Sequence, residues 1–256
     1  VDLMKVIVNA DDCGISDEVN EAIFELIQSG QLTSVSLIAN GPSIREAASK
    51  LRDFPRVSRG VHLNLTEFIP LTPSEKLGPL RVCLNEEGEF CGEQHLRSLT
   101  ITPTLLNAIF IELSSQIDAV KAMGIHVSHL DSHNHIHTIP GFFLVLKRLQ
   151  RHFGIRKVRT TWNIFPPGKP TNWGSRLKKQ VWHLALRHYY STVTTDGFTS
   201  LADFVEVASS KVLPFKSVEI MVHPGHSDFT EETNLLHSNW QSKVLVRMDF
   251  VSYESL

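Results

Sequence analysis

The sequence predicts one α/β domain over residues 1–256 with a mostly parallel sheet, and three observations support this fold class. Short apolar runs alternate with amphipathic helical patterns along the chain, which is typical of consecutive βα units. The length of 256 residues suits an α/β barrel, which needs roughly 250. No linker-like segment divides the chain. A closed or nearly closed barrel and an open doubly wound sheet both fit this element order, and both place their chemistry at the carboxyl ends of the strands.

Six runs are short, apolar and rich in β-branched residues, which predicts strands. In chain order we expect them over residues 4–9, 34–39, 59–65, 127–131, 157–161 and 218–222. Residues 66–99 hold much Gly, Pro and Glu without a clear period, so we expect a long excursion over one end of the fold. Residues 162–175 are rich in Pro, Gly and Asn and are expected to form a loop.

Helical periodicity and terminal residues predict the helices between these strands. In chain order we expect them over residues 16–30, 42–54, 102–124, 140–154, 175–190 and 200–211. Ser16 and Thr102 are typical N-caps, and Pro42 and Pro140 are typical of a first helical turn. Glycine ends three of the six helices, as is common at helix C-termini. The tail from Phe229 is expected to be helical for part of its length.

Composition excludes several functions. The net charge is −2 at pH 7, so no basic excess supports nucleic-acid binding. No apolar run approaches the roughly 20 residues of a membrane span. The first eight residues include Asp2 and Lys5 and lack the apolar core of a signal peptide, so we expect a cytoplasmic protein. Cys13, Cys83 and Cys91 lack the spacing of a structural zinc site, and no disulfide framework is expected.

Four polar clusters each lie at the end of a predicted strand. They are NADDCG (9–14), GVHLNL (60–65), HLDSHNHIH (129–137) and MVHPGH (221–226). Each has a structural alternative: the two aspartates could simply begin a helix, His62 could be a core histidine, the third cluster could be a polar loop and the fourth a turn. In the third cluster His129, Asp131 and His133 alternate and could line one side of an extended strand.

Considered together, the clusters indicate a hydrolytic metal site. One Asp with two His is the ligand set of an open catalytic site for Zn²⁺ or a similar ion. The remaining Asp and His then match a general base and a general acid. A carboxylate near a ligand His would orient its ring. This combination predicts amide or ester hydrolysis, although spacing alone does not decide between His129 and His133 as a ligand.

Six segments together resemble one family. They are NADDCG (9–14), TSVSLIANG (33–41), GVHLNLTE (60–67), HLDSHNHIH (129–137), GIRKVR (154–159) and HPG (223–225). They resemble the YdjC-like carbohydrate deacetylases, which include bacterial chitooligosaccharide deacetylases and are related to the NodB-like polysaccharide deacetylases. The resemblance implies an irregular, TIM-like (β/α) barrel of seven strands. It also implies removal of acetyl groups from N-acetylglucosamine units.

The resemblance also implies site residues, transferred by motif position. Asp12, His62 and His133 would bind one divalent metal ion. Asp11 would be the general base, and His223 would be the general acid or would stabilise the oxyanion. We expect Zn²⁺ or Mg²⁺, with Mn²⁺, Co²⁺ and Ni²⁺ as alternatives, because carboxylate and imidazole ligands accommodate all of them.

Three further residues are candidates for substrate binding. Asn64 shares one face of its strand with His62. Arg159 lies in a basic strand and could orient a carboxylate or the sugar, the alternative being a solvent-facing charge. Trp162 lies in a predicted loop, where its ring could stack on a sugar, whereas Trp182 on a predicted helix is expected in the core.

Two other functions fit parts of the pattern. One is a different metallohydrolase on the same scaffold, such as a phosphoesterase, and the other is a non-catalytic carbohydrate-binding or metal-storage protein. Among partners we expect an N-acetylated sugar, no nucleic acid and no membrane span. We also expect a homodimer, since symmetric dimers are the commonest soluble oligomers.

Overall fold

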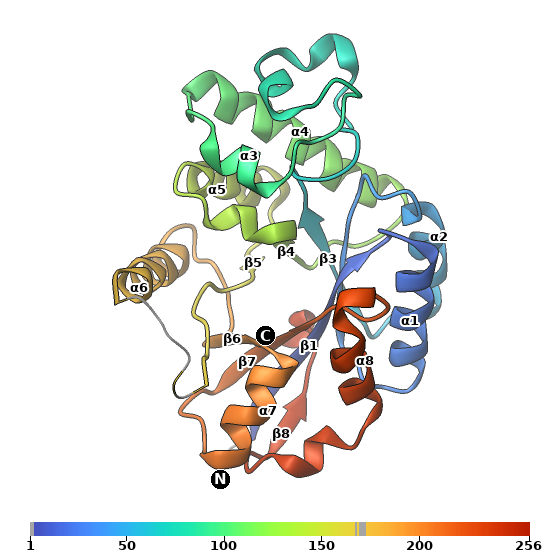
Figure 1. Ribbon diagram of the computed structural model, residues 1–256, viewed down its shortest axis with the longest axis vertical. Coiled ribbons are helices and arrows are strands. Elements are labelled where there is room, and N and C mark those ends of the chain that lie inside the picture. The colour runs from blue at the N-terminus through green and yellow to red at the C-terminus, as the bar shows by residue number, and fades with distance from the viewer. Residues whose placement is uncertain (1–2, 167, 169–172) are drawn as a thin grey trace.

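The computed structural model describes residues 3–166, 168 and 173–256, and it shows a curled parallel sheet surrounded by helices (Figure 1). Seven strands follow one another in the spatial order β5-β4-β3-β2-β1-β7-β6, and each neighbouring pair is parallel. Their bounds are Met4–Cys13 (β1), Ser34–Leu37 (β2), Ser58–Leu63 (β3), His129–Ser132 (β4), Lys157–Val158 (β5), Gly197–Ser200 (β6) and Ser217–Val222 (β7). The predicted irregular (β/α) barrel is confirmed.

The two ends of the strand order approach each other through a short irregular seam. Asn163, which follows β5, forms a parallel bridge to Phe198 of β6. The backbone N–H of Phe198 donates to Trp162 O at 2.9 Å, and Ile164 N–H donates to Phe198 O at 2.8 Å. Lys157 of β5 also forms a parallel bridge to Val193, which precedes β6. Because these isolated bridges replace a regular ladder among the described residues, the barrel is nearly closed rather than evenly hydrogen-bonded around its circumference.

The helices lie outside the sheet and cover its apolar faces (Figure 1). Their bounds are Asp17–Gln28 (α1), Ile44–Lys50 (α2), Glu93–Ser98 (α3), Pro103–Ala122 (α4), Phe142–Phe153 (α5), Trp173–His188 (α6), Leu201–Ser210 (α7) and Thr230–His237 (α8). The predicted N-caps are confirmed: Ser16 accepts from the N–H of Val19, and Thr102 accepts from that of Leu105. No helix of the described residues is long and apolar enough to cross a membrane.

Two strands were not predicted. β6 is only four residues long, and its last residue, Ser200, is also the N-cap of α7, so the helical signal obscured the strand. The strand β8 (Met248–Phe250) pairs in parallel with the start of β1. Its three residues are too few for a two-residue period to be recognised.

The excursion over residues 66–99 packs above α4 (Figure 1). A buried carboxylate fixes its start, because Glu112 of α4 accepts hydrogen bonds from Leu71 N at 3.0 Å and Thr72 N at 2.7 Å. Gln116, one turn further along α4, bonds both the N–H and the O of Asn64. These bonds position the segment that leaves β3 at the rim of the barrel.

Candidate active site

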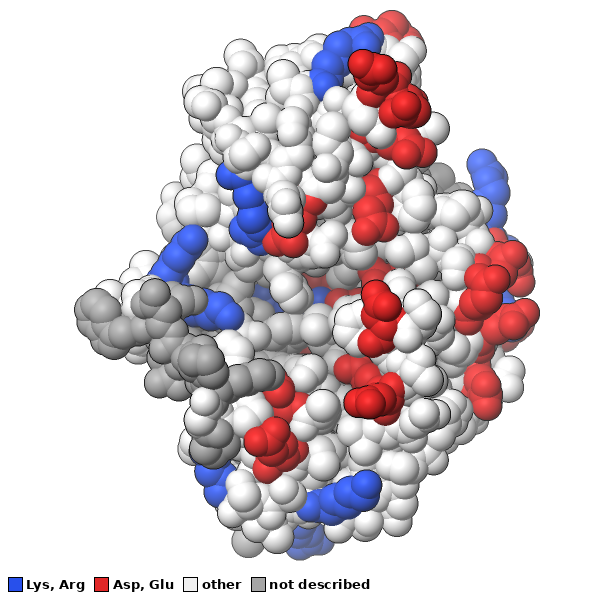
Figure 2. All heavy atoms as spheres, in the orientation of Figure 1, with Lys and Arg blue, Asp and Glu red and all other residues white. Residues whose placement is uncertain are grey.

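A cavity of about 700 Å³ opens at the carboxyl ends of the strands, where the face shown in Figure 2 is hollowed. The side chains that gather on one wall come from all four predicted polar clusters. They are Asp11, Asp12, His62, His133, His223 and His226. The structure therefore brings together the predicted base, acid and metal ligands.

The backbone at the end of β1 lets two consecutive aspartates reach this one site. The pairing of β1 with β2 shifts register between Ala10 and Cys13. Asp12 itself has a positive φ of 65°, a conformation that costs a non-glycine residue energy and that clusters at functional sites. Gly14, two residues further on, also has a positive φ of 96°. Because of these kinks, both carboxylates face the cavity.

Asp12 is at the centre of a buried cluster that suits one divalent metal ion. Its Oδ1 lies 2.8 Å from His133 Nδ1 and 3.3 Å from His62 Nε2. One donor atom from each of these three residues falls within 4.8 Å of the others. A carboxylate with two imidazoles matches the donor preference of Zn²⁺ and related ions.

His226 was not assigned a role from the sequence, although it lies in the fourth cluster. Its Nε2 is 3.2 Å from Asp12 Oδ2. That nitrogen is buried beside the Asp12 carboxylate. Glu67 was also missed, and its Oε1 lies 3.1 Å from His133 Nε2. The candidate metal-binding group therefore has one more imidazole and one more carboxylate at its edge than the motifs indicated.

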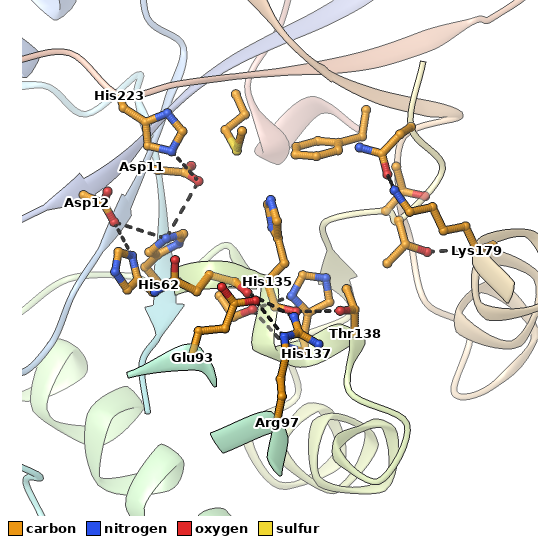
Figure 3. Close-up of a pocket in the computed structure, with 18 of the residues that line it drawn as sticks. Asp11, Asp12, His62, Glu93, Arg97, His135, His137, Thr138, Lys179 and His223 are labelled. Carbon is orange, nitrogen blue, oxygen red and sulfur yellow. Dashed lines mark hydrogen bonds and ion pairs between the residues drawn. The ribbon is translucent and has the colours of Figure 1, made fainter. Parts of the chain in front are cut away.

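Asp131 orients the ring of His62. Figure 3 shows this ring beside Asp11 and Asp12. Asp131 Oδ1 is 2.9 Å from His62 Nδ1, and a carboxylate can only accept here, so Nδ1 carries the proton. The other oxygen of Asp131 accepts from Ser36 Oγ at 2.7 Å. With Nδ1 held in this way, His62 presents Nε2 to the cavity, and this is the nitrogen that would bind a metal ion after losing its proton.

Arg159 is fully buried behind Asp11 and binds its carboxylate group. Its Nη1 donates to Asp11 Oδ2 at 2.7 Å and its Nη2 to Asp11 Oδ1 at 2.6 Å. Burial alone would raise the pKa of Asp11, but the positive charges of Arg159 and His62 outweigh it and lower that pKa overall. The solvent-facing alternative for Arg159 is excluded, because its exposed fraction is 0%.

A second layer lies beneath Arg159 and reaches the last residues of the chain. Arg159 Nε donates to Glu219 Oε1 at 2.8 Å, and Tyr253 Oη donates to Glu219 Oε2 at 2.5 Å. Tyr253 also stacks on His129 with ring centroids 3.7 Å apart. Burial lowers the pKa of His129 to about 3. His129 thus belongs to this buried layer, whereas His133 faces the cavity.

His223 is held by residues of the segment that follows β7. The carboxylate of Glu232 accepts from the backbone N–H of His223 at 2.6 Å and lies 3.7 Å from its Nδ1. The ring of Phe229 stacks on the imidazole at 4.4 Å. His223 Nε2 then points toward Asp11 Oδ2 at 4.0 Å. Burial lowers the pKa of His223, but Glu232 and the two aspartates raise it overall.

The remaining sequence candidates lie elsewhere. Asn64 is buried, and its side-chain amide donates to Asn40 Oδ1 at 3.0 Å and to Glu67 O at 2.8 Å. Neither Asn64 nor Trp162 is among the described residues that line the cavity. Trp182 was expected in the core but lines the cavity from α6. It packs edge-on against Phe143 at 5.1 Å.

A strained turn presents a further imidazole to the middle of the cavity. Residues Asn134 and His135 have φ values of 50° and 51°, so the chain reverses sharply after His133. His135 points into the cavity beside His137 (Figure 3). Burial lowers the pKa of His135 to about 4, so this ring is a neutral hydrogen-bonding group at neutral pH.

Comparisons with known proteins identify similar chains. Residues 5–249 match the family model described as YdjC-like protein. A protein named carbohydrate deacetylase from Geobacillus stearothermophilus is 33% identical over 224 residues, which is 87% of this chain and 80% of the relative. A protein of the same name from Brevibacillus brevis is 30% identical, with 88% of this chain and 83% of the relative covered.

One solved structure is similar over nearly the whole chain. It is a crystal structure of an Enterococcus faecalis protein, described as a candidate cellobiose-phosphate cleavage protein, with a TM-score of 0.78 and 22% sequence identity. The match covers 99% of this chain and 98% of that one. At this identity the likeness shows a shared fold.

Proposed function

Because the chain belongs to the YdjC-like protein family, we propose that it is a carbohydrate deacetylase that hydrolyses the amide bond of N-acetylated sugars with one divalent metal ion. The carbohydrate deacetylases to which it is similar support the reaction class. The observation that carries the proposal is the arrangement around Asp11. An ionised carboxylate lies between a metal-binding cluster and an imidazole with a raised pKa.

Asp12, His62 and His133 would hold the ion. When bound, a divalent ion lowers the pKa of a water molecule to about 7 and polarises the acetyl carbonyl. A second group, formed by Asp11, His62 and Asp131, is also compact enough for an ion. Arg159 already fills it, with Nη2 at 2.8 Å from Asp131 Oδ2, so the geometry favours a single metal ion.

The protein's own groups then move the protons. Asp11 Oδ2 accepts a proton from the water whose oxygen forms the new bond to the acetyl carbon. Arg159 keeps Asp11 ionised and fixes both its oxygens. As the carbon–nitrogen bond breaks, His223 Nε2 donates a proton to the leaving nitrogen, and acetate and a free amine result. General acid–base catalysis of this kind typically contributes 10²–10⁴-fold to a rate, to order of magnitude.

The rest of the cavity suits a sugar. Aromatic rings of Trp182 and Phe198 line it together with polar groups from Asn163 and Lys179, and such mixed surfaces are typical of small-molecule sites. We propose an N-acetylglucosamine unit of a chitooligosaccharide or a related glycan as the substrate. We further propose Zn²⁺ or Mg²⁺ as the ion, a cytoplasmic location and a homodimeric assembly.

The experiment that tests this function is acetate release from a panel of N-acetylglucosamine substrates, before and after chelation, with single metals restored. We expect release that the chelator abolishes and one metal restores. The variant D11N should lose release and keep its metal, and D118N, on the exposed face of α4, serves as the matched control. Phosphate release from phosphoesters by the metal-loaded protein, without acetate release, would instead indicate a phosphoesterase.

A further inference from the structure

Two free cysteines lie opposite each other at the base of a hairpin in the excursion. Leu84 and Phe90 form an isolated antiparallel bridge, and Cys83 and Cys91 are the next residues outward on the two sides. Both thiols are free. Cys83 is buried in the core, whereas Cys91 is partly exposed. Neither residue takes part in the proposed catalytic chemistry.

The backbone hydrogen bonds define how this pair is arranged. Cys91 N–H donates to Cys83 O at 3.0 Å, and Asn85 N–H donates to Glu89 O at 2.8 Å. In this pattern Leu84 and Phe90 are the non-hydrogen-bonded pair, so Cys83 and Cys91 are directly opposite on the other face. Opposite residues of this type have Cα atoms about 5.5 Å apart. Disulfides span Cα separations of roughly 4.4–6.8 Å, so this pairing lies within the range of Cα separations that a disulfide can bridge.

The surroundings of the two thiols differ in a way that assigns their order of reaction. Burial raises the pKa of Cys83 to about 12, and the nearby Cys91 contributes to the shift. Because the thiolate is the nucleophile, the more accessible Cys91 reacts first and Cys83 second. Cys13, the remaining thiol, is fully buried near Asp12 and has a pKa raised to about 12.

We propose that Cys83 and Cys91 are a dithiol modification site that forms an internal disulfide when it meets a small disulfide such as oxidised glutathione. The Cys91 thiolate attacks one sulfur of the glutathione disulfide and releases one glutathione thiolate. Cys83 then attacks the Cys91 sulfur, the second glutathione leaves, and the Cys83 proton passes to it. Two protein thiols are oxidised and one glutathione disulfide is reduced to two glutathione thiols.

The position of the pair connects its redox state to the cavity. Cys91 precedes Gly92, the residue before α3, and Glu93 and Arg97 of α3 line the cavity. Arg97 Nε bonds Glu93 Oε1 at 2.7 Å. A bond between Cys83 and Cys91 would therefore anchor the start of α3 to the core and stiffen this wall of the cavity.

The test uses the full-length folded protein in buffers of defined ratios of reduced to oxidised glutathione, followed by acid trapping, intact mass and peptide mapping. We expect a product two hydrogens lighter than the reduced protein, with Cys83 joined to Cys91. The variant C83S should stop at a glutathione adduct on Cys91. The variant C91S should stay unmodified under the same conditions. C13S is the matched control and should form the internal disulfide like the wild type.

Limited proteolysis provides a second measurement. The exposed turn at residues 85–87 should be cleaved at least several-fold more slowly in the oxidised protein than in the reduced one, and C13S should behave in the same way. A wild-type protein that stops at the glutathione adduct, or that pairs Cys13 as often as Cys83, would overturn the proposal. Equal amounts of adduct on all three cysteines would overturn it as well.

Discussion

Replacing Arg159 with methionine tests whether one buried guanidinium neutralises the carboxylates of the candidate active site. Arg159 makes hydrogen-bonded ion pairs with Asp11, Asp131 and Glu219 at 2.6–2.8 Å, and its side chain is fully buried. Methionine has a similar length but leaves these carboxylates without their cation. Breaking a buried ion pair costs about 3–5 kcal/mol of unfolding free energy, so R159M should lose at least about 3 kcal/mol at pH 7.

R187M is the matched control, because Arg187 pairs with Asp196 at the same distance of 2.8 Å but has a side chain 42% exposed. An exposed pair contributes only about 0–1 kcal/mol, so R187M should unfold almost like the wild type. Urea unfolding followed by circular dichroism measures both values. The loss of unfolding free energy in R159M should be smaller at pH 5 than at pH 8, because the carboxylates left without their cation can take up protons at the lower pH. An equal, small loss in both variants would refute the reasoning.

Three further predictions concern the residues around the centre. D131N should weaken metal binding by about 10–100-fold, as expected for loss of a carboxylate that orients a ligand such as His62; competition with a chromophoric chelator measures this, and unchanged affinity would contradict the assigned role. E232Q should lower kcat about tenfold or more with little change in KM. It should also move the basic limb of the pH–rate profile to lower pH, because Glu232 helps raise the pKa of His223; an unmoved limb would exclude that influence. Burial raises the pKa of Glu219 to about 7, so its protonated form stabilises the fold fully below pH about 4.5 and this contribution is lost as pH rises to about 7. E219Q should flatten the stability profile over that window in urea unfolding at a series of pH values, and a profile as steep as that of the wild type would show that other groups dominate.

Local sequence signals were sufficient to predict most of the strands that position the site. The apolar runs that became β1, β2, β3, β4 and β7 are buried on both sides of the sheet, so each was recognisable from its own residues. The edges of the strand order were harder. β5 is only two residues long, and β6 is a four-residue strand that ends in a helix cap. Such short elements are stabilised by their neighbours rather than by a local pattern.

The candidate site likewise contains some residues that the sequence indicated and others that it did not. Asp11, Asp12, His62, His133 and His223 lie at strand ends, so sequence order alone indicated that they would meet. The supporting residues could not be found in this manner. Glu232 and Tyr253 approach their partners, His223 and Glu219, from segments that the sequence left uncertain. Their roles depend on the folded path of the chain, which the spacing of residues within a motif does not indicate.

The hydrogen bond from Tyr253 to Glu219 has a consequence for the order in which the protein acquires its structure during synthesis. β1 and its neighbour β8 pair in the sheet, yet β8 is made more than 200 residues after β1. Until Tyr253 emerges, Glu219 has no phenol donor beneath it, and His129 has no ring to stack on. The nascent chain can thus bury its core strands early, while the layer beneath Arg159 is completed only after β8 and Tyr253 have been made.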